Sequence, residues 1–152
     1  MRASVTAIGA RRRWMAILAK ARSDDLEAAW AELGVVPDYR ILRGPEIGLV
    51  MVRGRAGGTG TRFNLGEMTV TRCTVELGNN NVGHAYVRGR QRRHAELAAV
   101  LDAMLQDPAR RADVEGRVIE PLAAEQADRR RTAEAKAAAT RVEFLTLVRG
   151  ED

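Results

Sequence analysis

The sequence is poor in cysteine and in aromatic side chains, and each shortage limits what the chain can do. Its single cysteine, Cys73, permits no disulfide within the chain and cannot hold an iron–sulfur cluster by itself. Cys73 lies in a strand-like pattern, which favours a small buried side chain over a nucleophile. Aromatic residues make up only 4% of the chain, and none is interleaved with arginines in a recognised base-stacking motif.

Long apolar runs are missing as well. No stretch approaches the roughly 18 consecutive apolar residues that a membrane span needs, and the N-terminus lacks the sustained apolar region of a signal peptide. We therefore expect no membrane association and a cytoplasmic location. The length of 152 residues, with 45% hydrophobic and 30% charged residues, predicts a single domain over residues 1–152 with one core.

Lysine is nearly missing: of the 25 basic residues, only Lys20 and Lys136 are not arginine. Arginine suits bidentate contacts with phosphate or carboxylate groups, although codon bias in the source would give the same composition. The formal net charge of +5 indicates an anionic partner, which is a nucleotide, a nucleic acid or an acidic protein surface.

Apolar spacing predicts helices at both ends of the chain. Residues 1–10 are expected to be a loose start, followed by a helix from Arg11 and a second short helix. The clearest helix spans about residues 91–106. Glu120-Pro121 is expected to begin another helix, and residues 122–152 are expected to form an extended helical arm with an apolar tail.

The middle of the chain reads as strands with short connections, which imply antiparallel pairing. Turn signals at Gly44-Pro45 and at residues 78–81 separate them. The four candidates are Tyr39–Arg43, Ile47–Arg55, Arg62 or Met68 through Leu77, and Val82–Arg88. The predicted fold class is therefore α+β, with a roughly four-stranded antiparallel meander packed against the helices.

A glycine-rich hairpin between two of these strands is the first candidate site. Arginines crowd the connection, so backbone N–H groups lie among fixed positive charges, and two interpretations stay open: a phosphate cradle or an ordinary exposed hairpin loop. No P-loop ending follows the glycines, and a strand stands where that motif requires a helix. The candidate contact residues are Arg53, Arg55, Gly57, Gly58, Gly60 and Arg62.

A second candidate site lies at the strand-to-helix junction in GHAYVRGRQRRHAE, residues 83–96. Arg90 and His94 are the candidate contact residues here. Arg90 could meet an anion near free helix amides, and the position of His94 on the apolar stripe favours a hydrogen-bonded core or interface histidine over a catalytic one. No metal-ligand spacing and no nucleophile elbow is present in the sequence. The residues alone therefore predict an anion-binding or partner-binding module with no catalytic residue and no metal site.

Three motifs in fixed order then carry a resemblance: GGTG-x-RF, GR-x-x-x-HAE and VRG-[ED]. Together with RRRWMAILAKA and IEPL, they make the chain similar to the G subunit of the bacterial carbon–phosphorus lyase core complex. The similarity covers nearly the whole chain beyond residue 10. It implies a subunit of an assembly that also contains H, I and J subunits and serves phosphonate catabolism.

In that family, ATP and an alkylphosphonate react with displacement of adenine. The activity is that of an alpha-D-ribose 1-methylphosphonate 5-triphosphate synthase. The resemblance implies that the I subunit carries this transferase chemistry and that the J subunit, with S-adenosylmethionine and an iron–sulfur cluster, cleaves the C–P bond later. For this chain it implies an accessory subunit that binds no cofactor itself, most directly beside the I subunit. Whether the chain has activity alone stays open. The alternatives are a basic nucleic-acid-binding protein and a self-associating homo-oligomeric scaffold.

Overall fold

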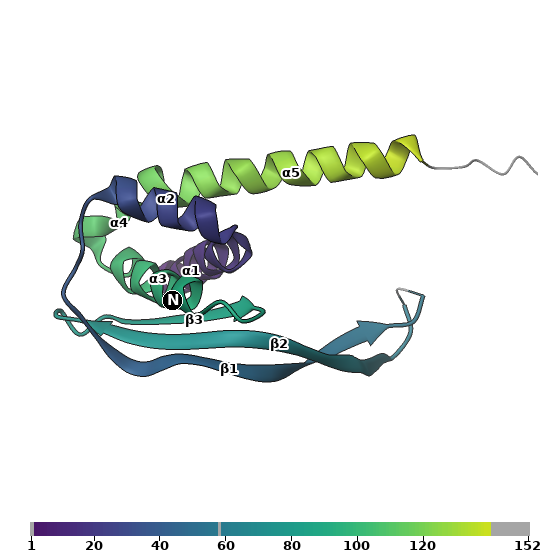
Figure 1. Ribbon diagram of the computed structural model, residues 1–152, viewed down its shortest axis with the longest axis horizontal. Helices are drawn as coiled ribbons and strands as arrows, with labels where there is room; N and C mark the ends of the chain where they lie inside the picture. The colour runs from purple at the N-terminus through teal and green to yellow at the C-terminus, as the bar shows by residue number, and fades with distance from the viewer. Residues whose placement is uncertain (1, 58, 141–152) are drawn as a thin grey trace, which may run out of the picture.

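The fold is a three-stranded antiparallel sheet with helices packed on one face, as Figure 1 shows. The computed structural model describes residues 2–57 and 59–140. In spatial order the strands are β1 (Tyr39–Arg55), β2 (Arg62–Leu77) and β3 (Val82–Arg88). The helical elements are α1 (Arg2–Lys20), α2 (Ser23–Leu33), α3 (Arg92–Leu105), α4 (Pro108–Val114), the π-helical segment η1 (Glu115–Ile119) and α5 (Glu120–Ala139). The predicted α+β class is confirmed.

β1 is one long strand, whereas the sequence predicted two strands separated at Gly44-Pro45. Its register with β2 shifts between Ile41 and Arg43 and again between Arg43 and Glu46, so Gly44-Pro45 is an irregularity inside the strand. Within the described residues no strand pairs with the outer side of β1, so a proline there is tolerated as it is on other edge strands. The prediction of four strands is therefore wrong: the sheet has three.

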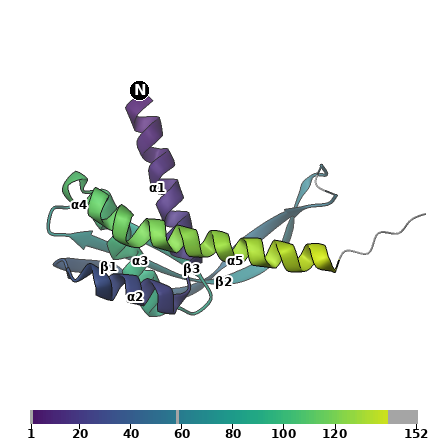
Figure 2. The ribbon, with the colours of Figure 1, turned by 90° about the horizontal axis from the view of Figure 1, so that it is seen from above.

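The N-terminal helix is longer than the sequence predicted, because α1 begins at Arg2 rather than at Arg11. The expected loose start is therefore wrong for residues 2–10. Once the packed half of a helix exists, each added residue gains a hydrogen bond without a new nucleation cost, so extension is easy. Figure 2 shows the first turns of α1 standing clear of the other elements.

Helical structure begins earlier at the C-terminal end than expected, since α4, η1 and α5 form one continuous run. Asp107 caps this run by accepting a hydrogen bond from the Ala109 N–H (3.0 Å). The π-helical segment precedes Pro121, which has no N–H to donate one turn back, and Glu120 N–H instead reaches the Glu115 carbonyl. The predicted helix is confirmed through Ala139, while the predicted apolar tail lies outside the described residues.

The last ten described residues, 131–140, are all exposed, and α5 extends past the rest of the helices (Figures 1 and 2). Leu122 is the buried residue that anchors the start of α5 to the body. Among the described residues, no helix combines the length and the apolar character that crossing a membrane would require.

α3 is the centre of the core, and it confirms the helix that the sequence predicted for about residues 91–106. Almost every residue from His94 to Leu105 is buried between the sheet and the other helices. The closest approach is at Gly83 of β3, where a Cβ atom would stand 1.9 Å from the Ala99 carbonyl oxygen and 2.7 Å from the Ala103 nitrogen. Both atoms are backbone, so a side chain at position 83 cannot be accommodated by a rotamer change.

We expect Gly83→Ala to lower the free energy of unfolding by about 3 kcal/mol, because α3 must move away from β3. The matched control is Gly116→Ala in η1, where a Cβ meets nothing within 4 Å and φ is not positive. That change should stabilise by about 0.5 kcal/mol through the unfolded state. Urea unfolding followed by circular dichroism measures both, and equal effects would contradict the close-packing argument.

The buried carboxylate of Asp102 joins α3 to α1 and β3. Asp102 of α3 is fully buried and accepts from Arg11 Nη2 (2.7 Å) and Trp14 Nε1 (2.9 Å) of α1. It also accepts from the backbone N–H of His84 in β3 (2.9 Å). Arg11 supplies the opposite charge and is about one third exposed. Asp102 therefore fixes where α1 lies relative to β3.

Removing this acceptor should be among the most damaging single changes. Asp102→Ala leaves the Trp14 indole N–H and the His84 amide without their acceptor, and we expect a loss of about 3 kcal/mol in the free energy of unfolding. Asp113→Ala removes an exposed carboxylate that lies 3.5 Å from Arg117, and should cost less than about 0.5 kcal/mol. Chemical denaturation of the two variants side by side checks the difference.

Candidate functional site

The β1–β2 hairpin extends beyond the rest of the sheet and forms the most prominent candidate site (Figure 1). The last residue that β3 pairs is Val70 of β2, opposite Arg88. Residues 49–69, which we call the hairpin arm, therefore have no third strand beside them in the described structure. Figures 1 and 2 show the hairpin arm and α5 projecting from the body on the same side.

One face of the hairpin arm continues the face that the helices cover in the body. Leu49 pairs with Thr69, and Met51 pairs with Glu67. These side chains lie on the same face of the sheet as the buried Thr71, because residues two apart along a strand share a face. With no helix above them, Leu49 is 61% exposed and Met51 is 51% exposed. A row of apolar side chains thus passes from the core into solvent without changing face.

The opposite face of the hairpin arm is also apolar. A register shift between Val52 and Arg53 leaves Leu65 as an extra residue in β2, which is a β-bulge. The Phe63 ring packs over Gly54, with its Cζ 3.6 Å from where a Cβ on Gly54 would stand. Leu65 is nevertheless 67% exposed. The hairpin arm therefore offers apolar contact area on both faces.

The tip of the hairpin arm concentrates positive charge. Arg55 pairs directly with Arg62, and Arg53 lies two residues earlier on the same face. Like charges opposite one another in a ladder are destabilising, and an anionic group between them would relieve the repulsion. In the described part of the chain, none of these three arginines takes part in a salt bridge.

Two of the predicted glycines are required by the shape of the tip. Gly57 has φ +59, a left-handed conformation that glycine adopts without strain. Gly60 donates its N–H to the Ala56 carbonyl (3.0 Å), and a Cβ on Gly60 would stand 2.7 Å from that oxygen. Gly58, the third predicted glycine, lies outside the described residues. The loop is thus a specific turn that presents the arginines.

The second predicted site, at the junction of β3 and α3, is separate from the tip. Arg90 is exposed at this junction. Gly89, its neighbour, donates to the Thr69 carbonyl, which places the junction at the base of the hairpin arm. The seven residue-to-residue steps from Arg62 to Thr69 span roughly 23 Å of strand. The structure therefore does not bring Arg90 together with Arg53, Arg55 and Arg62.

His94 is a buried, hydrogen-bonded core histidine, the interpretation that the sequence favoured. It is 2% exposed. Its Nε2 lies 2.8 Å from the Leu18 carbonyl, so Nε2 carries the proton, because a carbonyl only accepts. Its Nδ1 lies 3.3 Å from the Ser23 hydroxyl. His94 therefore ties the end of α1 and the start of α2 to α3, and it is not available for direct contact with a ligand.

The residues at the junction are held by Thr71. Its hydroxyl donates to the Gly89 carbonyl (2.6 Å) and accepts from the Gln91 N–H (2.9 Å), which closes the turn into α3. Arg92 donates to the Pro45 carbonyl (2.8 Å) and so fastens the start of α3 to the irregular part of β1. Within the described residues, no group of three or more His, Cys, Asp and Glu side chains is arranged to hold a metal ion.

Cys73 is buried in β2, as predicted, and its thiol donates to the Arg43 carbonyl (3.4 Å). Burial raises the pKa of the Cys73 thiol to about 11, with the negative charge of Glu96 contributing in the same direction. The thiolate is the reactive form, so the folded protein holds this side chain in its unreactive state near neutral pH.

We therefore expect Cys73 to resist alkylation by iodoacetamide at pH 8. A pKa near 11 instead of 9 leaves about 100-fold less thiolate at that pH, and burial slows access further. The same chain unfolded in guanidinium chloride should react at the rate of an ordinary cysteine. Mass spectrometry of both samples gives the ratio, and complete labelling of the folded chain within minutes would contradict the assignment.

Fold and site together define an α+β protein whose long hairpin keeps apolar side chains in solvent and ends in an arginine-rich turn. The chain belongs to the family described as phosphonate metabolism protein PhnG, whose model matches residues 9–150. It is also 48% identical over 145 residues to a protein of Rhizobium meliloti (strain 1021) named alpha-D-ribose 1-methylphosphonate 5-triphosphate synthase subunit PhnG. That match covers 95% of this chain and 92% of the relative.

Proposed function

We propose that this chain is an accessory subunit of an alpha-D-ribose 1-methylphosphonate 5-triphosphate synthase assembly in phosphonate catabolism. The name of the Rhizobium meliloti relative and the family match support this role over nearly the whole chain. The assembly transfers the ribose-triphosphate part of ATP to an alkylphosphonate with release of adenine. It works in the cytoplasm, with H, I and J subunits as partners and the I subunit in most direct contact.

The observation that carries this proposal is the hairpin arm. Leu49 and Leu65 lie on opposite faces of a two-stranded ribbon, and both are more than half exposed. A two-stranded ribbon is marginally stable alone, and apolar area that is in solvent in the isolated chain favours association with another protein. The hairpin arm is therefore the principal docking element for the partner subunits.

The arginine-rich tip has its own role in this proposal. Arg53, Arg55 and Arg62 meet an anionic group at the subunit interface, either the triphosphate of the substrate or a partner carboxylate. Bidentate geometry and the relief of the Arg55–Arg62 repulsion both favour such a contact. Gly57 and Gly60 shape the turn that presents them, and Arg90 makes a second contact at the base of the hairpin arm.

Co-expression with the H, I and J subunits tests the docking role. We expect Leu49→Asp and Leu65→Asp to reduce recovery of this chain with a tagged I subunit at least about tenfold, because each places a charge in an apolar contact. The control is Leu42→Asp, an exposed leucine of β1 outside the hairpin arm, 47% exposed in this structure. Equal recovery of all variants would contradict docking through the hairpin arm.

Adenine release by the assembled complex separates contact from assembly. A complex containing Arg62→Ala that assembles normally but releases adenine at least tenfold more slowly would support contact between Arg62 and the substrate. Arg90→Ala tests the junction of β3 and α3 in the same way. Normal release in an intact complex excludes direct contact. Loss of assembly assigns the arginine to the protein interface instead.

A further inference from the structure

β3 forms the second edge of the sheet, and its backbone shows which groups remain free there. Leu77 N–H donates to the Asn81 carbonyl (2.9 Å), and Gly89 N–H donates to the Thr69 carbonyl (2.8 Å). In an antiparallel ladder the hydrogen-bonded pairs alternate, so the odd-numbered residues between these two points bond to β2. The residues that turn their backbone groups outward are Val82, His84, Tyr86 and Arg88.

Half of this outer edge is already occupied by the side chains of Asp102 in α3 and of Gln106, the residue that follows α3. Gln106 Nε2 donates to the Val82 carbonyl (2.8 Å), and Asp102 accepts from the His84 N–H (2.9 Å). The other half is open. In the described part of the chain, no hydrogen bond reaches the His84 carbonyl, the Tyr86 N–H and carbonyl, or the Arg88 N–H from the outer side.

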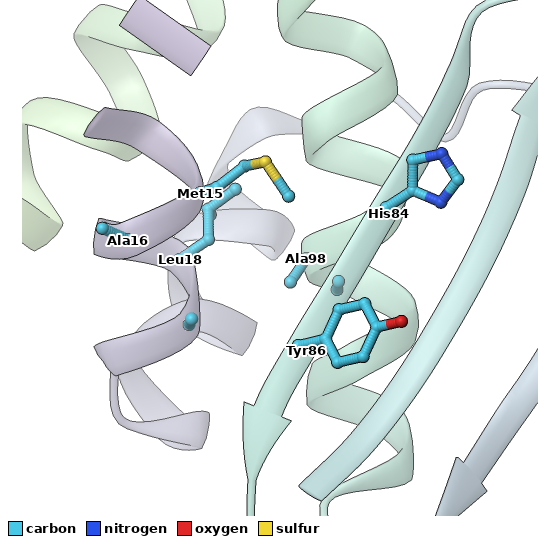
Figure 3. A pocket seen from close by; sticks show the side chains of 8 residues that line it. Met15, Ala16, Leu18, His84, Tyr86 and Ala98 are labelled. Carbon is cyan, nitrogen blue, oxygen red and sulfur yellow. The ribbon is translucent and has the colours of Figure 1, made fainter. Parts of the chain in front are cut away.

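A groove runs beside the open half, between β3 and α1. Its first part is a hollow of about 230 Å³. Figure 3 shows Met15 and Leu18 of α1 facing β3 across it. A second hollow of about 370 Å³ continues it toward α3 and shares Ala19 with the first. We call the two hollows together the β3 groove. Met15, Leu18 and Ala19 line its α1 side, and Ala85, Tyr86 and Arg88 line its β3 side.

We propose that the β3 groove binds an extended segment of a partner protein, which adds to the sheet as a fourth strand. The proposal rests on the proposed function in one respect: the partner is a subunit of the same assembly. Tyr86 offers an outward N–H and carbonyl as one hydrogen-bonded pair, and the His84 carbonyl and Arg88 N–H offer the neighbouring bonds. Only a chain in extended conformation presents complementary groups at this spacing.

The lining of the groove defines the side chains of this segment. The floor is apolar, and alanines at positions 19, 85 and 98 leave room for apolar side chains of the added strand. Lys20 and Arg88 flank the end of the groove nearest α3, and within the described residues neither makes a salt bridge. The partner segment is therefore apolar at alternate positions and carries a carboxylate at the end beside Lys20 and Arg88.

The test compares amide hydrogen exchange in the chain alone and in the assembled complex with the H, I and J subunits. We expect the amides of Tyr86 and Arg88 to exchange at least about tenfold more slowly in the complex, because both become donors to the added strand. The amides of Ala85 and Val87 face β2 in both states and serve as the internal reference.

Two variants test the groove itself. Ala19→Trp fills the position that both hollows share, and Lys20→Glu reverses the charge at its end without changing a buried side chain. We expect each to weaken binding to the partner subunits at least fivefold, with unfolding midpoints close to that of the unchanged chain. The matched control is Ala112→Trp on the exposed side of α4, which should bind as before.

Each outcome separates this proposal from the others. A complex that assembles while Tyr86 and Arg88 exchange as in the free chain overturns the fourth strand and leaves the proposed function intact. Failure to assemble overturns both. A chain ending at Thr140, mixed with a synthetic peptide of residues 141–152, tests the chain's own C-terminal segment: protection of Tyr86 by that peptide alone would assign the groove to it and overturn the partner strand.

Discussion

The carboxylate of Asp102 is the interaction on which the arrangement of the helices and the sheet depends. It lies inside the core with no exposed surface, and its donors come from α1, from β3 and from Gln106 just after its own helix. A buried acceptor satisfied from several elements at once favours one relative position of those elements over its alternatives. Together with the close contact of Gly83 and α3, it sets the distance between α1 and β3 that keeps the groove beside them open.

Much of this fold could be predicted from periodicity, and the errors have local causes. The stripe of α3 and the turn at residues 78–81 were visible because each is a short-range pattern. Pro45 was taken as a strand boundary because a proline signals a break, whereas on an edge strand its missing N–H breaks no ladder bond. Asp102 stands among the apolar residues of α3, which indicates a buried polar group. Gly83 stands inside a strand, which indicates a close approach of another backbone.

The sequence identified the residues of the candidate site but not how they lie relative to one another. Glycine spacing and arginines identified the tip, and the φ of Gly57 confirms that a special turn is needed there. The sequence predicted the end of β3 at Arg88, but it left the start of β2 open between Arg62 and Met68. It therefore did not show how far β1 and β2 pair beyond the end of β3, which depends on the whole sheet. That early end exposes the apolar faces of the hairpin arm and separates Arg90 from the arginines at the tip.

The π-helical segment has a consequence for how this chain tolerates a change in length. A π-turn contains one more residue than the α-helical turn it replaces, and each residue of a helix corresponds to about 100° of rotation. Losing that residue would rotate every side chain of α5 by about 100° around the helix axis, a little more than a quarter turn. Gln126, which donates to the Ile17 carbonyl (2.8 Å), and Arg129, which pairs with Asp25 (2.9 Å), would both leave their partners. The extra residue thus determines which face of α5 is turned toward α1 and α2.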